Sequence, residues 1–233
     1  MSFLYHNILF RPLFNLLVFL YNVIPGNDFG LAIILLTVIV RFIFFPLSVK
    51  ALISQKELSR LQPKIKELQD KYKNDKQALG KATMELYKEH GVNPLGGCLP
   101  MLVQLPVLIA LYSALSSGLN PESFSALYSF IGHPAAIKQV AFGLVDLTKK
   151  APFLAILAGV LQWFQTKQAT SFQAPASKDE PVSAALQMNR QMLYFFPIII
   201  IIIGWNLPAG LILHWIVTTV FSIFEQGYIK ARG

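Results

Sequence analysis

Charged residues are scarce in this chain, and their scarcity excludes an ordinary soluble domain. Asp, Glu, Lys and Arg make up 14% of the 233 residues, whereas hydrophobic residues make up 54%. A soluble domain carries about 25% charged residues. The net charge of +8 would suggest nucleic acid as the partner of a soluble protein. Here the basic residues lie between long apolar runs, which is typical of a membrane protein oriented by its Lys and Arg residues.

The sequence also lacks the residues that several kinds of catalytic and binding chemistry need. Cys98 is the only cysteine, which excludes an internal disulfide. The four histidines are scattered without metal-ligand spacing, and no Gly-x-x-x-x-Gly-Lys-Ser/Thr loop for nucleotide phosphates occurs. An intramembrane serine protease is one alternative, with Ser113 and His214 as nucleophile and base, but the Gly-x-Ser turn is absent. We therefore expect no enzyme, no metal and no cofactor.

What is present is a series of apolar stretches. A transmembrane helix needs about 20 mostly apolar residues, and four stretches meet that standard while a fifth is short and flanked by polar residues. The predicted spans are 29–51, 93–118, 151–168, 190–204 and 209–226. Only Trp205–Pro208 separate the last two, which predicts a tight hairpin. The fold class is therefore predicted to be all-α, as a polytopic membrane protein with one domain.

The segment 3–24 precedes these spans and differs from them in being amphipathic. Its polar residues recur at spacings of four, four and seven, which places them on one helical face. These residues are Asn7, Arg11, Asn15 and Asn22. We interpret the segment as a helix that lies in the interface on the outer side of the membrane. A sixth membrane span is the alternative.

Lys and Arg predict the orientation of the chain. Ten of the twenty lie between Lys50 and Lys88. If that segment is cytoplasmic and five spans are threaded, fifteen basic residues fall inside and four fall outside. This asymmetry follows the positive-inside rule. We therefore expect the N-terminus outside and the C-terminus in the cytoplasm, with the protein in the plasma or inner membrane.

The basic segment 52–91 has the pattern of a cytoplasmic helical hairpin. Apolar residues recur at helical spacing on both sides of a predicted Asn74-Asp75 turn. They are Leu61, Ile65, Leu68 and Tyr72 before the turn, and Leu79, Ala82 and Leu86 after it. A solvated charged linker is the alternative, but it would not require this apolar seam.

Arg41 is the residue in the spans that most needs an explanation. It lies about 18 Å along the first predicted helix, measured from Phe29. A charge at the bilayer centre costs about 2.5–3.5 kcal/mol on insertion scales. Glu225 is the only acid within the spans, at the far cytoplasmic end of the last one. We therefore expect Arg41 to have no carboxylate partner in the bilayer and to lie in a water-filled groove.

Other polar or amphipathic residues of the spans are candidates to line that groove with Arg41. Thr37 lies one helical turn before Arg41 on the same face. The remaining candidates are Gln104, Gln162, Gln165, His214 and Trp215. A cationic groove with amides and hydroxyls suits a passing polar peptide, and an acidic segment would make a charge-assisted contact with Arg41. The alternative is a structural Arg41 that binds backbone carbonyls and Gln side chains.

Three motifs in this sequence resemble the YidC/Oxa1/Alb3 insertases. The run Asn93-Pro94-Leu95-Gly96-Gly97-Cys98-Leu99-Pro100-Met101-Leu102-Val103-Gln104-Leu105-Pro106, followed by Ala110-Leu111-Tyr112, is similar to the family's second core helix. The run Leu207-Pro208-Ala209-Gly210-Leu211-Ile212-Leu213-His214-Trp215 is similar to the start of its last helix. Thr37, Arg41 and Pro46-Leu47 resemble its first core helix. The resemblance covers essentially the whole chain.

The resemblance implies a five-helix insertase core, with an outer amphipathic helix and a cytoplasmic hairpin. It implies a groove that is open to cytoplasm and lipid but closed outside. There Arg41 and Thr37 receive a client's hydrophilic tail, Trp215 contacts clients, and Gln162 or its rival Gln165 supplies an amide. The implied partners are client membrane proteins and the lipid bilayer, with the ribosome and the Sec translocon as further candidates and a monomer as the working unit. A small-solute or ion transporter is the alternative function.

Overall fold

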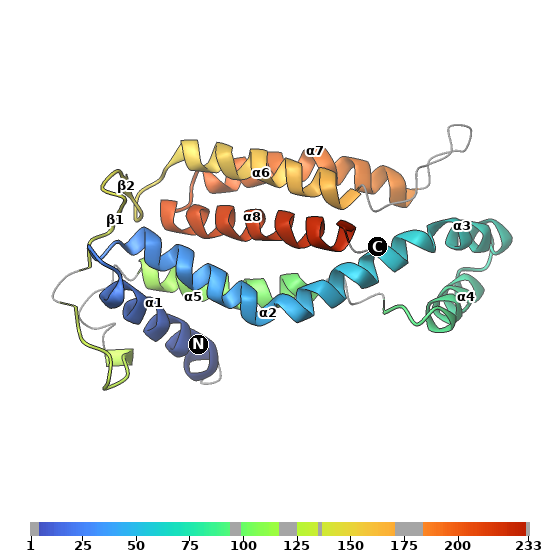
Figure 1. The fold of residues 1–233 in the computed structure, drawn as a ribbon. Coiled ribbons are helices and arrows are strands. Elements are labelled where there is room, and N and C mark those ends of the chain that lie inside the picture. Colours follow the sequence, from blue (N-terminus) through green and yellow to red (C-terminus); the bar gives the residue numbers. More distant parts are fainter. Residues whose placement is uncertain (1–4, 94–98, 117–124, 135–136, 171–183, 232–233) are drawn as a thin grey trace.

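A computed structural model describes residues 5–93, 99–116, 125–134, 137–170 and 184–231. Cys98 and the rest of the Pro94–Cys98 part of the predicted second span lie outside these residues. Five long helices lie lengthwise beside one another (Figure 1). They are α2 (Phe29–Arg60), α5 (Leu99–Ser116), α6 (Pro152–Thr170), α7 (Ala184–Gly204) and α8 (Ala209–Ala231). The α8 helix packs against both α2 and α6, and α6 packs against α7.

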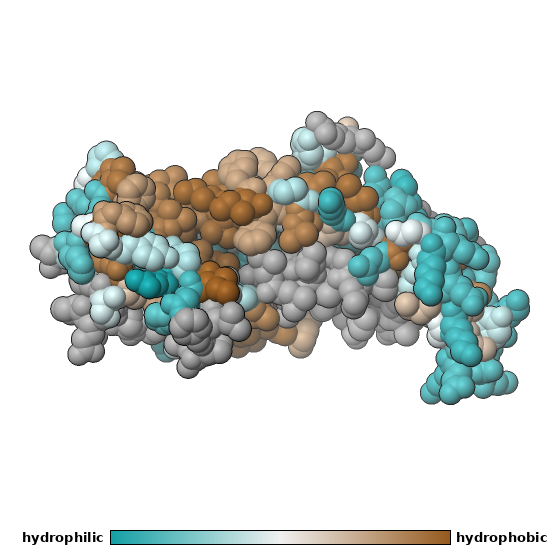
Figure 2. Space-filling view, turned by 90° about the horizontal axis from the view of Figure 1, so that it is seen from below, coloured by the Kyte–Doolittle hydropathy of each residue, from teal (hydrophilic) through white to brown (hydrophobic). Residues whose placement is uncertain are grey.

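The two ends of this bundle differ. At one end lie the segments 125–134 and 137–150, the second of which contains a short antiparallel sheet of β1 (Val140–Ala141) and β2 (Val145–Asp146). We call it the loop end. At the other end α3 (Gln62–Lys71) and α4 (Lys76–Glu89) form a helical hairpin, and we call it the hairpin end. Figure 2 shows hydrophobic residues along the bundle and hydrophilic residues gathered most densely at the hairpin end.

The α2 helix is the longest of the described elements and is longer than a membrane span requires. Its 32 residues extend about 48 Å, whereas the hydrocarbon core of a bilayer is about 30 Å thick. The predicted span ends at residue 51, whereas the helix includes Pro46 without interruption and continues to Arg60. Its last turns are polar, so they suit water beyond the bilayer. The helix thus carries the α3–α4 hairpin away from the bundle.

Two helices in the described part of the chain are long and apolar enough to cross a membrane, namely α2 and α8. The segments Gln104–Ser113 and Leu193–Gly204 are shorter apolar helices. The structure is therefore that of a mostly helical protein with candidate membrane spans. The full five-span topology stays a prediction.

The N-terminal segment forms a π-helical turn, η1 (Tyr5–Phe10), followed by α1 (Arg11–Val23). The polar face of α1 is covered by the loop end. Arg11 Nε and Asn15 Nδ2 both donate to the Ala126 carbonyl, at 3.0 Å each, and Asn15 Oδ1 accepts from the Tyr128 N–H. The side chains that suggested an interfacial helix therefore hold a loop in place.

The main apolar core lies toward the loop end. It joins buried side chains of α1 and α2 to α5, α8 and the loop: Phe14, Leu17, Val18, Tyr21, Phe29, Ile33, Leu36, Leu111, Leu115, Leu127, Leu147 and Leu211. Helices approach closely here because α8 begins with small residues. A Cβ added to Gly210 would lie 2.8 Å from the Leu115 side chain and 3.3 Å from that of Ile33. Glycine at this position therefore allows α8 to pack against α2 and α5.

Candidate functional site

The charged centre of the bundle is a pair formed by Arg41 and Glu225. Arg41 Nη1 lies 3.8 Å from Glu225 Oε2, and the side chains are only 14% and 3% exposed. The expectation that Arg41 has no carboxylate partner is therefore wrong. Both α2 and α8 run from the loop end to the hairpin end, so Arg41 at about 18 Å and Glu225 at about 24 Å along their helices reach similar depths. The long arginine side chain spans the remaining offset.

This ion pair leaves much of its hydrogen-bonding capacity unused. Arg41 Nη2 donates to the Thr218 carbonyl at a long 3.4 Å. Among the described residues, four buried polar atoms lack a hydrogen-bond partner: Arg41 Nε, Thr218 Oγ1, Glu225 Oε1 and Gln226 Oε1. Native proteins leave few such atoms, and each calls for an explanation. One belongs to Arg41 on α2, and the other three belong to residues of α8.

A polar cavity beside the ion pair supplies that explanation. Its volume is about 320 Å³, and α2, α6, α7 and α8 all contribute to its wall. The lining residues are Arg41, Ser48, Leu52, Gln55, Gln162, Gln165, Thr166, Ala169, Phe196, Ser222, Glu225 and Gln226. A water molecule occupies about 30 Å³ in the liquid, so the cavity has room for several. Water in this space would hydrate the charges that the protein leaves incompletely paired.

Gln162 and Gln165, on the wall of this cavity, form a hydrogen-bonded group with Trp215. The Trp215 indole N–H donates to Gln162 Oε1 at 3.4 Å. Gln162 Nε2 in turn donates to Gln165 Oε1 at 2.7 Å. The two glutamines therefore act together, although the sequence presented them as rivals for one position. Trp215 borders the cavity through its contact with Gln162.

A second polar group lies closer to the loop end and links three helices. Thr37 Oγ1 donates to the Ile33 carbonyl at 2.6 Å, so it accepts from His214 Nδ1 at 2.8 Å. With its proton on Nδ1, a neutral His214 accepts at Nε2 from Gln104 Nε2, at 2.7 Å. This chain of bonds satisfies both ring nitrogens. It joins α2, α5 and α8 on the loop-end side of the cavity.

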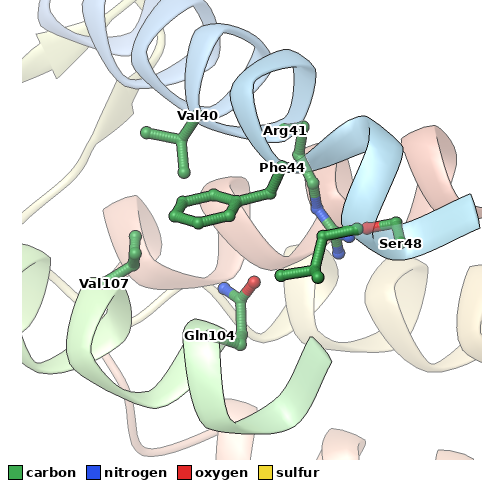
Figure 3. Close-up of a pocket in the computed structure, with 7 residues that line it drawn as sticks. Val40, Arg41, Phe44, Ser48, Gln104 and Val107 are labelled. Atoms are coloured by element: carbon green, nitrogen blue, oxygen red, sulfur yellow. The ribbon is translucent and has the colours of Figure 1, made fainter. Parts of the chain in front are cut away.

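Gln104, a member of this second group, also lies beside Arg41. Figure 3 shows it on α5, facing the side chains of Phe44 and Arg41 on α2. A hollow of about 20 Å³ lies between them, with Val40, Leu47, Ser48 and Val107 completing its wall. Thr37 and His214 border a separate space of only about 10 Å³ among apolar side chains. The open volume is thus concentrated on the hairpin side of Arg41.

The predicted site residues therefore divide into two sets. Arg41, Gln162 and Gln165 line the large cavity, with Trp215 at its edge. Thr37, His214 and Gln104 form the hydrogen-bonded layer above it. Sequence reasoning missed Glu225 and Gln226 as members of the site. The signal was present, because Glu225 was the only acid in a span, but its neighbours in space could not be read from the sequence.

Fold and site together define a helical membrane protein with a charged, polar cavity between its helices. A family model described as 60Kd inner membrane protein matches residues 19–233. A membrane protein insertase YidC of Fusobacterium nucleatum is 38% identical over 210 residues, covering 89% of this chain and 88% of the relative. The chain therefore belongs to the 60Kd inner membrane protein family, which is the YidC/Oxa1 family.

Other relatives are much longer than this chain. A membrane protein insertase YidC of Geotalea daltonii is 37% identical over 222 residues, covering 94% of this chain but 37% of the relative. One of Geobacter sulfurreducens is 38% identical over 224 residues, covering 94% and 36% respectively. The chain thus spans little more than a third of these longer relatives and most of the Fusobacterium protein.

Proposed function

We propose that the protein is a membrane insertase, a non-enzymatic chaperone that moves client proteins into the bilayer. The observation that carries this proposal is the cavity of about 320 Å³ beside Arg41, inside a bundle with two candidate membrane-spanning helices. A hydrophilic tail crossing a bilayer must leave water, and burial of its polar groups without partners is costly. A hydrated, charged cavity reduces the thickness of apolar material that the tail must cross.

Arg41 is the proposed binding group for the tail. Its guanidinium has donors left over after the contacts with Glu225 and Thr218, and Nε has no partner. A tail carboxylate would make charge-assisted hydrogen bonds with these donors. The membrane potential is worth about 2.3 kcal/mol per charge per 100 mV and would then draw an anionic tail outward. Binding at Arg41 is therefore proposed to be transient.

The client's apolar helix is proposed to enter lipid along the outside of the bundle. The outward faces of α6 and α7 expose large apolar side chains, which suit lipid contact in a protein of this family. They include Phe153, Ile156, Leu157, Val160 and Phe164 on α6, and Phe195, Ile198 and Ile202 on α7. The cavity wall and this apolar surface share α6 and α7. A client could thus place its tail in the cavity while its helix contacts lipid.

Orientation and partners complete the proposal. The hairpin end is cytoplasmic and the loop end lies outside, as the Lys and Arg distribution predicts. The α3–α4 hairpin carries exposed lysines that could contact ribosomal RNA through its phosphates. The Sec translocon is a further candidate partner, and the working unit is proposed to be a monomer.

The test is insertion of a single-span client with an acidic tail into liposomes that contain only this protein. We expect wild type and Arg41→Lys to insert the client and Arg41→Ala to lose most of that activity, because the charge is needed. The matched control is Arg60→Ala, since Arg60 lies at the exposed end of the same helix and pairs with Glu57 at 2.8 Å. Equal insertion by all four proteins would contradict the role of Arg41, and no insertion by wild type would contradict the function.

A further inference from the structure

Glu225 places a carboxylate beside the arginine that is proposed to bind client tails. Its carboxylate is nearly buried, and one oxygen, Oε2, lies 3.8 Å from Arg41 Nη1. At that distance the two groups attract each other as charges but do not form a short hydrogen bond. The second oxygen, Oε1, has no hydrogen-bond partner among the described residues. Both members of the pair therefore keep capacity for a third, incoming group.

The same cavity is open to both charges. Arg41 and Glu225 each line the space of about 320 Å³, together with the uncharged amides Gln55, Gln162 and Gln165. Among the described residues that border this cavity, the charged groups therefore sum to zero. A cavity lined by Arg41 alone would attract acidic tails and repel basic ones. The paired cavity offers a cation to a carboxylate and an anion to an ammonium or guanidinium group.

We propose that Glu225 is a specificity-determining residue, which widens the range of client tails from acidic ones to tails of either charge. This inference rests on the proposed insertase function. An acidic tail that binds Arg41 must compete with Glu225 for the guanidinium. A basic tail can use Glu225 as its partner and thereby lessens its repulsion from Arg41.

The experiment uses two single-span clients that differ only in their outer tails, one with two Asp residues and one with two Lys residues. Insertion into liposomes without a membrane potential is measured for wild type, Glu225→Gln, Glu225→Asp and Glu57→Gln. Glu57→Gln is the matched control, because it removes the same charge from an exposed residue of α2 that pairs with Arg60 at 2.8 Å.

The measured quantity is the ratio of acidic-tail to basic-tail insertion. We expect Glu225→Gln to raise this ratio about 25-fold, because loss of one unit charge about 4 Å from the tail in a hydrated site favours the acidic tail about fivefold and disfavours the basic tail about fivefold. Glu225→Asp and Glu57→Gln should keep the wild-type ratio. An unchanged ratio in Glu225→Gln would show that Glu225 is only structural, and an equal shift in Glu57→Gln would show a non-local charge effect. Either result overturns the proposal.

Binding of the two tail peptides to the folded, monodisperse fraction in detergent gives a second readout. It should show the same change in preference, even if Glu225→Gln reduces the yield of folded protein. If wild type binds both peptides but inserts neither client, the insertase function fails while peptide binding still decides the charge role of Glu225. If the preference of folded Glu225→Gln for the acidic peptide equals that of wild type, the proposal fails.

Discussion

The loop end and the hairpin end of the bundle treat polar groups in opposite ways. At the loop end, polar side chains of α1 are bound to the backbone of the loop, as with Asn15, which is 2% exposed. Toward the hairpin end lie the four buried polar atoms that lack partners within the described part of the chain, three of them on residues that line the large cavity. The loop end is thus a closed, hydrogen-bonded cap, whereas the region toward the hairpin end contains polar groups that need water or a ligand.

The boundary between these regions is the layer formed by Thr37, His214 and Gln104. Its hydrogen bonds are short and complete, and they join three helices. Arg41 lies on the hairpin-end side of this layer, and the main apolar core lies on its loop-end side. In the proposed mechanism the rigid loop end would hold the helices in register while they separate around a client toward the hairpin end.

The largest expected effect on stability comes from the close packing of α8 against α2 and α5 at the loop end. Gly210→Val should lower the free energy of unfolding by about 3 kcal/mol, because the added atoms collide with Leu115 and Ile33. Gly80→Ala is the control, since a Cβ there meets nothing within 4 Å and Gly80 lies inside α4. We expect that control to be stabilising by about 0.5–1 kcal/mol. Denaturant titration in detergent measures both, and equal effects would contradict the packing difference.

A smaller effect is expected from the cap itself. Asn15→Ala removes the partner of the Tyr128 N–H and one of the two partners of the Ala126 carbonyl, and should cost about 2 kcal/mol of unfolding free energy. Gln55→Ala, on the cavity wall, should change it by less than about 0.5 kcal/mol, because water can replace that side chain. The same titration compares the two variants. If Gln55→Ala proves as damaging as Asn15→Ala, the hairpin half is not hydrated as we describe.

The smallest effect concerns Asp146 in the loop end, outside the predicted spans. The Thr148 hydroxyl, at 2.6 Å, and Lys149 lower the pKa of Asp146 to about 2. Because the folded pKa is depressed, its contribution is complete above the ordinary pKa near 3.8 and is lost as the pH falls toward 2. Asp146→Asn should therefore lower the melting temperature slightly at pH 6, and the difference from wild type should shrink below pH 3. A difference that is constant with pH would contradict this assignment.

The sequence was enough to predict an all-α membrane protein and its family, because apolar runs, Arg41 and the Pro- and Gly-containing motifs are local signals. It could not predict the Arg41–Glu225 pair, since residues that are 184 positions apart meet only through the packing of α2 on α8. The role of Asn15 was hidden for the same reason. Its spacing with Arg11 indicated a polar helical face, but not that loop backbone would cover it.

The most direct test of the half-open groove is the reactivity of single cysteines, in a Cys98→Ala background, toward a membrane-impermeant maleimide. Gln165 lies on the cavity wall. Leu144, at the loop end between β1 and β2, is 85% exposed, whereas Leu17 in the main apolar core is 1% exposed. We predict that Gln165→Cys reacts only from the cytoplasmic side of vesicles, Leu144→Cys only from the outside, and Leu17→Cys from neither. Labelling of Gln165→Cys from outside, or its protection from the cytoplasmic side, would contradict a groove that is open to the cytoplasm and closed at the loop end.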